Sequence, residues 1–187
     1  PSRLSTCKDP QEIPAFRFFE KSQTLSVRKG DDPMSTRADQ TFVFIDGQNF
    51  YLSCKHAFRI RYPDFDIGKV GHHLARRVGE GEAAGINFYT GMPDPKISTR
   101  WHEFWTNKLA MAEAEGIEVF SRPLVYQLET EPEAPKRYKI LSTREKGIDM
   151  RMGLDIMETA RRRDCRRIVI ASRDQDFREV VEKIEMM

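Results

Sequence analysis

The sequence predicts a three-layer α/β fold, in which helices cover both faces of a mainly parallel central sheet. Short apolar runs rich in strand-forming residues alternate along the chain with segments of helical periodicity. This alternation is typical of β-α units, whose strands run parallel because each crossover returns the chain to the same edge of the sheet. At 187 residues the chain is long enough for one domain with a sizeable core and an appendage.

The first two strands are separated by two helical segments. A strand is predicted over 41–45 (TFVFI), and the polar turn DGQN after it leads into helical spacing over 50–58. A second helical segment covers 67–79, and the apolar run at 85–89 (GINFY) predicts the second strand. A loop with the sequence TGMPDPKIS is expected to follow.

The next part of the chain predicts a helix, a strand and an excursion. Aromatic and aliphatic residues recur at three- and four-residue intervals over about 99–115, and a glycine then supplies the helix stop. A third strand is expected at 117–120. The segments 122–128 and 136–141 flank a Glu/Pro-rich stretch and predict a loose hairpin. Helical period returns over 147–163.

Residues 1–40 differ from the rest of the chain. They are polar, mixed in charge and without apolar period, so we expect an N-terminal arm or linker that is poorly ordered. The aromatic patch at 13–21 (IPAFRFFEK) is long enough to dock on another surface, so the arm could bind a protein partner or a second copy of the chain. The domain itself is expected over residues 41–187. Its last helical pattern would normally be followed by another strand, which raises the question of truncation at the C-terminus.

The composition restricts the broad class of protein. No apolar run approaches the roughly 20 residues that a membrane span needs. The three cysteines (Cys7, Cys54 and Cys165) are odd in number and far apart, so we expect free thiols in a reducing compartment and a cytoplasmic location. The net charge of +2 is nearly balanced and says little about partners.

Two of the four predicted strands end in carboxylates. Asp46 follows the first strand, and the fourth strand at 167–171 (RIVIA) leads to Asp174 and Asp176 before a helix begins at Phe177. Ligands of open parallel sheets bind beyond the carboxyl ends of strands. If the two strands are neighbours, about 4.8 Å apart, Asp46 and Asp174 lie close enough to share one cation. Carboxylates are ligands that Mg²⁺ or Mn²⁺ takes, and such a cation would relieve their mutual repulsion.

Asp149, at the expected start of a helix after REKG, is a third contributor. Asp155 is a weaker candidate, because six residues along a helix place it about 120° away from the face of Asp149. An Asp after a strand is often a turn-former or a helix cap, and for Asp149 alone capping is the better explanation. The convergence of Asp46, Asp149, Asp174 and Asp176 on one edge favours a metal site.

These segments resemble the NYN domain, a branch of the PIN-like nuclease superfamily. FIDGQNFY, YTGMPDP, RPLVY, REKGIDMRMGLDIM and IVIASRDQDF occur in the order found in that family, between residue 41 and about residue 183. The resemblance implies a Rossmann-like (PIN-like) fold and a metal-dependent nuclease acting on RNA. It also implies an acidic site at the matched positions Asp46, Asp149, Asp174 and Asp176, with Asn49 beside them.

One motif departs from the family pattern. The family usually has S-G-D-S-D-F, whereas this chain has Arg173 in place of the glycine and Gln175 in place of the second serine. The change removes backbone freedom and adds a bulky cation at the mouth of the site. Two hypotheses follow: a metal-dependent endoribonuclease, or a catalytically weak PIN-like module that binds nucleic acid or a protein partner. A metal-dependent phosphatase is disfavoured, because FIDGQN lacks a second Asp two residues after the first.

Five further residues are candidates for binding an RNA substrate, single-stranded or structured. The Asn49 amide could orient the attacking water or contact a ribose oxygen, and a helix-start hydrogen bond explains it equally well. Ser172 could bind phosphate or cap its turn. Arg144 and Lys146 could grip phosphate, or be solvated loop charges. Arg173 could clamp the substrate phosphate.

Overall fold

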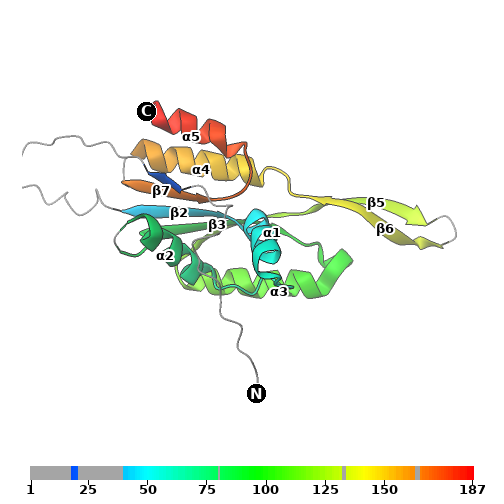
Figure 1. Ribbon diagram of the computed structural model, residues 1–187. Coiled ribbons are helices and arrows are strands. Elements are labelled where there is room, and N and C mark those ends of the chain that lie inside the picture. Colours follow the sequence, from blue (N-terminus) through cyan, green and yellow to red (C-terminus); the bar gives the residue numbers. More distant parts are fainter. Residues whose placement is uncertain (1–17, 21–39, 80, 132–133, 163–164) are drawn as a thin grey trace, which may run out of the picture.

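The computed structural model describes residues 18–20, 40–79, 81–131, 134–162 and 165–187. A five-stranded sheet has the order β1-β7-β2-β3-β4, and four of its strands are parallel, which confirms the predicted mainly parallel α/β fold (Figure 1). The strands are β1 (Phe18–Glu20), β2 (Thr41–Asp46), β3 (Gly85–Met92), β4 (Glu118–Pro123) and β7 (Arg167–Ala171).

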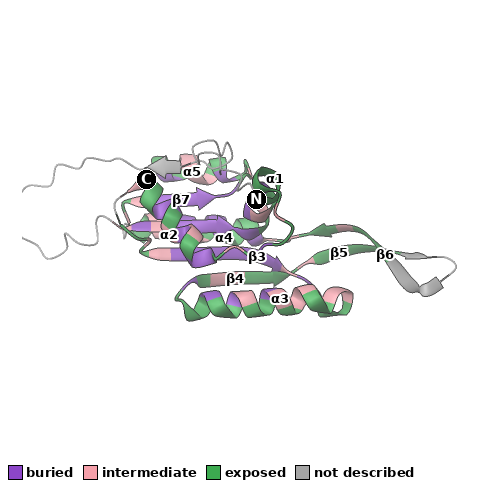
Figure 2. Cartoon of the chain, turned by 60° about the horizontal axis from the view of Figure 1, so that its bottom comes forward, coloured by how far each residue is buried: buried purple, intermediate pink, exposed green. Residues whose placement is uncertain are grey.

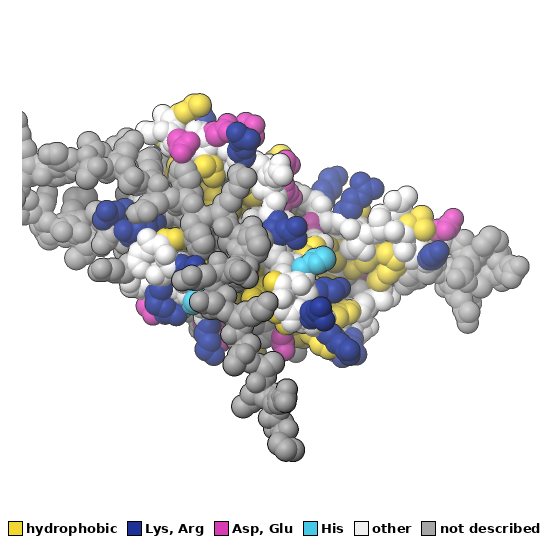
Figure 3. All heavy atoms as spheres, viewed as in Figure 1, with side chains coloured by type: hydrophobic (Ala, Val, Ile, Leu, Met, Phe, Trp, Pro, Cys, Tyr) yellow, Lys and Arg dark blue, Asp and Glu magenta, His cyan; other side chains and the backbone are white. Residues whose placement is uncertain are grey.

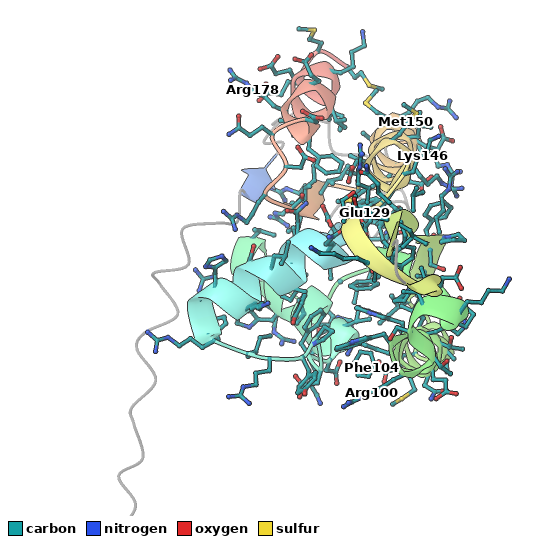
Figure 4. All side chains as sticks on the ribbon, turned by 90° about the vertical axis from the view of Figure 1, so that its right-hand side faces the viewer. Arg100, Phe104, Glu129, Lys146, Met150 and Arg178 are labelled. Atoms are coloured by element: carbon teal, nitrogen blue, oxygen red, sulfur yellow. The ribbon has the colours of Figure 1, made fainter. Side chains whose placement is uncertain are left out.

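Helices cover both faces of this sheet. One face carries α1 (Gly47–Phe58), α2 (Ile67–Val78) and α3 (Pro95–Ala114), and the other carries α4 (Ile148–Arg162) and α5 (Phe177–Glu185) (Figure 1). Figure 4 shows the two outer layers end-on, with Arg100 and Phe104 on α3 at one side of the molecule and Met150 on α4 nearer the other. None of the helices in the described ranges is both long and apolar enough to cross a membrane.

Each face of the sheet has its own hydrophobic cluster. Side chains of β2 alternate between the two, so that Val43 and Ile45 pack beneath α1, α2 and α3 while Phe44 packs beneath α4 and α5. The inner strands are buried on both faces, which explains why they read as continuous apolar runs, and the edge strand β4 is largely exposed (Figure 2).

The segment predicted as the loop TGMPDPKIS has more regular structure than expected. Strand β3 continues to Met92, because its parallel pairing with β4 extends to Pro123. Helix α3 then begins at Pro95, and the side chain of Asp94 accepts a hydrogen bond from the Lys96 amide at 2.8 Å. The backbone is non-helical only at Ser98 (φ −151°, ψ 87°), where two helical pieces meet. The sequence prediction therefore ended the strand before Met92 and began the helix about one turn after Pro95.

The predicted hairpin is confirmed. Strands β5 (Val125–Glu131) and β6 (Ala134–Arg144) form a separate antiparallel pair that projects from the body of the molecule (Figure 1). The hairpin leaves from the end of β4 and returns directly to the start of α4, so its base lies at the carboxyl edge of the sheet. It exposes the hydrophobic side chains of Val125, Leu128, Ile140 and Leu141.

Most of the N-terminal arm, predicted as poorly ordered, lies outside the described residues. Its aromatic patch contributes β1, which pairs antiparallel with β7 in the register Phe19↔Ile168. The sequence did not predict this strand, because three residues are too few to show a period. An extended segment is stabilised there because the outer edge of β7, on the side away from β2, would otherwise have no strand partner.

Candidate functional site

The innermost acid of the site is Asp46, at the end of β2. It is 1% exposed, and its Oδ1 accepts a hydrogen bond from the Asn49 amide at 3.0 Å. Its Oδ2 accepts from Asn49 Nδ2 at 2.6 Å and from Ser172 Oγ at 2.8 Å. Asp46 thereby caps α1, and the Ser172 bond ties this helix start to β7. Asp46 can therefore be both the cap of α1 and a member of the candidate site.

The neighbouring strand brings the second and third acids to the same edge. Strands β2 and β7 are adjacent and parallel, so that Asp46 and Ser172 follow paired strand ends, as the sequence predicted. Ser172 Oγ accepts from the Asp174 amide at 3.0 Å, and Asp174 Oδ1 accepts from the Asp176 amide at 3.0 Å. Asp176 starts α5 without a side-chain capping bond. The turn after β7 is thus ordered by its own side chains.

The fourth acid, Asp149, lies in the first turn of α4. Partial desolvation raises its pKa, and the charges of Asp46, Asp174 and Asp176 raise it further. These repulsions mean that the four aspartates lie near one another at one edge of the sheet. Their carboxylates do not form a metal-binding geometry, because within the described ranges no three Asp, Glu, His or Cys side chains are gathered tightly enough to hold a metal ion.

A fifth carboxylate, Glu145, was missed by the sequence reasoning. Its pKa is raised to about 7, chiefly by burial and also by the charges of Asp46 and Asp149, while a hydrogen bond from the Gly91 amide at 2.5 Å acts in the opposite direction. The amide nitrogen of Gln48, turned toward Glu145, donates to its two oxygens at 3.2 and 3.3 Å. The signal was present in REKG, where an acid stands between the two cations that were considered.

One of the three comparisons with known proteins gives a match. The sequence model of the NYN domain matches residues 40–187. The chain belongs to the NYN domain family. This family is part of the PIN-like nuclease superfamily and consists generally of nucleases, so the chain has a nuclease-type fold suited to nucleic acid. Comparison with curated proteins and with solved structures found no match.

Two predicted substrate residues contact Asp46. The sequence left open a water or ribose contact and a helix-start hydrogen bond for Asn49, and phosphate binding and turn capping for Ser172. Asn49 Nδ2 and Ser172 Oγ both donate to Asp46, so the helix-start and turn contacts are present. Asn49 reaches the carboxylate from the first turn of α1, and Ser172 directly follows the end of β7. In this NYN domain they hold Asp46 in place.

The three predicted cations lie on the surface around the acids. Arg144, Lys146 and Arg173 are all exposed, and within the described part of the chain no ion pair engages them. Lys146 lies at the start of α4 (Figure 4), and Lys and Arg side chains gather over the base of the hairpin (Figure 3). These residues are available to a phosphate backbone.

The loss of the family glycine at Arg173 costs less than the sequence suggested. Among the described non-glycine residues, Arg59 is the one with a positive φ, so Arg173 holds its turn without left-handed backbone. The backbone freedom that is lost with glycine is therefore not needed in this turn. What remains is the added positive charge.

Asp155, the weaker candidate, is engaged outside the acid cluster. The Tyr89 hydroxyl donates to it at 2.9 Å, and Arg151 Nε donates at 2.8 and 2.9 Å to its two oxygens. Asp155 thus ties α4 to β3 and is left to a structural role.

Proposed function

We propose that this NYN domain is a metal-dependent endoribonuclease that hydrolyses RNA phosphodiester bonds at Asp46, Asp149, Asp174 and Asp176. The observation that carries the proposal is the gathering of acids at the carboxyl ends of the adjacent parallel strands β2 and β7, where Ser172 links Asp46 to the turn of Asp174 and Asp176, and the raised pKa of Asp149 agrees with it. Carboxylates that repel one another at the carboxyl edge of a parallel sheet are costly unless a cation or a substrate compensates for them.

The donor set fits Mg²⁺ or Mn²⁺ in its chemistry. All the candidate ligands are carboxylate oxygens, which these hard cations prefer. Asp46 Oδ2 accepts two hydrogen bonds, whereas Oδ1 accepts one and keeps a second lone pair that can accept a cation. A divalent ion there would supply the positive charge that polarises the scissile phosphate and activates water for in-line attack.

The chain's own residues would hold and align the reacting groups. Asn49 and Ser172 fix the orientation of Asp46, so that its carboxylate does not rotate when substrate arrives. The exposed charges of Arg144 and Lys146 would bind the phosphates on either side of the cleaved bond.

A second candidate function is a catalytically weak module that binds nucleic acid or a protein partner. The exposed Arg173 favours it, because a cation beside Asp174 can compensate for the acids that a metal would otherwise neutralise. The free thiol of Cys54 supports a reducing, cytoplasmic setting for either function.

The deciding experiment is cleavage of end-labelled single-stranded RNA with Mn²⁺ or Mg²⁺. We expect wild type to cleave and EDTA to abolish cleavage. Asp174→Asn should lose at least about 100-fold in rate. Asp64→Asn, a matched change at an exposed aspartate far from the cluster along the chain, should retain the wild-type rate. RNA binding by wild type without metal-dependent cleavage would support the second function instead.

A further inference from the structure

A cavity lies beside the acids, between the start of α1, the first part of α3 and the base of the hairpin. Its volume is about 210 Å³, which is below the roughly 300–1,000 Å³ of pockets for drug-sized ligands and suits a single planar ring system. We call it the aromatic pocket; its lining includes Gln48, Tyr51, Thr90, Trp101, Trp105 and Glu145.

The aromatic pocket and the acid cluster share a wall. Gln48 is two residues beyond Asp46 in the first turn of α1. Glu145, whose pKa is raised by burial and then by the charges of Asp46 and Asp149, lines the pocket from the other side. Carboxylates affect one another in this way only when they are near. A molecule whose ring occupies the pocket therefore has its next covalent group beside the acids.

The aromatic side chains of the pocket are held in place before any ligand arrives. Trp105 belongs to the hydrophobic core, and Trp101 packs against that core. The Tyr51 hydroxyl donates to the Arg61 carbonyl at 2.8 Å. At the rim, the half-exposed Tyr62 lies against Trp101, with ring centroids 5.9 Å apart. Rigid aromatic walls favour a flat ring, because little conformational entropy is lost when it binds.

Polar groups in the same walls suit the edge of such a ring. The amide nitrogen of Gln48 donates to Glu145 and leaves the amide oxygen as an acceptor, and the buried Thr90 contributes a hydroxyl. Stacking surfaces combined with amide and hydroxyl groups are how proteins bind unpaired bases of single-stranded RNA.

We propose that the aromatic pocket binds one unpaired nucleobase of single-stranded RNA, next to the phosphate that the acids address. The inference rests on the proposed function for its choice of RNA, and it adds a substrate class: a base stacked in a duplex cannot enter, so single strands and loops are preferred. Occupation of the pocket does not require cleavage, which allows the two proposals to fail separately.

Tryptophan fluorescence tests the pocket directly, because the chain has two tryptophans and both line it. The probes are hexamers of adenylate and of uridylate and an abasic ribose-phosphate hexamer. Each is titrated into wild type with Ca²⁺ in place of Mg²⁺, and again in EDTA. We expect at least one base-bearing hexamer to quench the fluorescence saturably in Ca²⁺ and the abasic hexamer not to. Equal responses to all three probes, or no response in either buffer, would overturn the proposal.

Two variants locate the binding. Trp101→Ala should weaken binding of the base-bearing hexamer about tenfold, measured by anisotropy of a labelled probe. Gln48→Ala, at an exposed helix position where folding is not at stake, should weaken it about threefold. Phe58→Ala, which removes a 60% exposed aromatic that does not line the pocket, is the matched control and should bind like wild type. Equal binding by Gln48→Ala and wild type would contradict the proposal even if Trp101→Ala did not fold.

The outcomes separate the pocket from the chemistry. Base-dependent quenching without metal-dependent cleavage would leave the pocket standing and remove the nuclease activity. Cleavage at the wild-type rate by Trp101→Ala, without quenching in wild type, would keep the nuclease activity and remove the nucleobase pocket. Quenching by a peptide of aromatic residues, but by neither base-bearing hexamer, would assign the pocket to a protein ligand and overturn the nucleobase proposal.

Discussion

The inner and outer parts of the acid cluster are held in opposite ways. Asp46 is buried and accepts three hydrogen bonds, from Asn49 and Ser172, so its charge is compensated by the protein itself. Asp149 is exposed, and its pKa is raised by partial desolvation and by three neighbouring aspartates. The inner acid is therefore held by hydrogen bonds of the fold, whereas the repulsion on Asp149 would be relieved by the cation of the proposed function.

Replacing the inner acid should have the largest effect. We expect Asp46→Ala to lower the free energy of unfolding by about 3 kcal/mol, because Asn49 and Ser172 lose their acceptor and α1 loses its cap. Asp149→Ala should leave stability unchanged or raise it in EDTA, because it removes repulsion. Urea unfolding of both variants measures the contrast, and equal losses would remove the distinction between inner and outer acids.

Gly47, next to the inner acid Asp46, and Gly147, two residues before the outer acid Asp149, allow the same comparison for the backbone. A Cβ at Gly47 would lie 2.5 Å from Phe88 Cζ and 2.9 Å from the Tyr89 carbonyl oxygen, so Gly47→Ala should cost about 2 kcal/mol. Gly147, before α4, has φ +73° and faces the movable Arg122 side chain. Gly147→Ala should cost about 1 kcal/mol. Thermal unfolding gives the order, and a larger loss at Gly147 would reverse it.

The pH dependence of stability should report the uncompensated charges. The folded-state pKa of Glu145, about 7, lies above its ordinary value of 4.5, because of burial and then of Asp46 and Asp149. Between these values the folded chain binds more protons than the unfolded chain, so stability falls as pH rises through this window. At this half-buried position we expect a loss of about 1–2 kcal/mol in EDTA.

Matched variants test the origin of that loss. Glu145→Gln should flatten the profile between pH 4.5 and 7, whereas Glu129→Gln, on the exposed hairpin (Figure 4), should leave it unchanged. Added Mn²⁺ should stabilise wild type more at pH 7 than at pH 5, because the cation competes with protons for the acids. A profile that is the same for Glu145→Gln and wild type would refute this origin.

Arg173→Gly should have the smallest effect on stability, within about 0.5 kcal/mol, because Arg173 is exposed and its turn does not require positive φ. We expect RNA cleavage to be preserved or increased, since a competing cation leaves the mouth of the site. Initial rates at several Mn²⁺ concentrations measure this. A complete loss of cleavage would show that Arg173 contributes to catalysis by binding the substrate phosphate.

Part of the acid cluster could be predicted from local sequence patterns. Asp46 and Asp174 were placed together because each follows an apolar strand, and parallel neighbours end at one edge. Glu145 follows no such rule. It reaches the site because the hairpin returns the chain beside β3, where the Gly91 amide, 54 residues earlier, bonds its carboxylate. Separations of that length leave no trace in a periodic pattern.

The aromatic residues of α3 show the same limit. Their helical spacing predicted the helix but not which of its rings is buried, and Trp105 is buried at 9% exposure. Trp101 shares that spacing but stands half-buried at the rim of the aromatic pocket. Whether a ring on the apolar face of a helix meets core or cavity depends on what the neighbouring segments cover.

The sequence by itself determined the α/β order, the parallel sheet and the family of this protein, because strand and helix periods and ordered motifs are local properties of the chain. Tertiary structure alone decided that Ser172 binds Asp46, that Glu145 joins the acids and that two tryptophans line a pocket beside them. These contacts join segments far apart in the chain, and their energies depend on burial and distance, which exist only after the layers have packed.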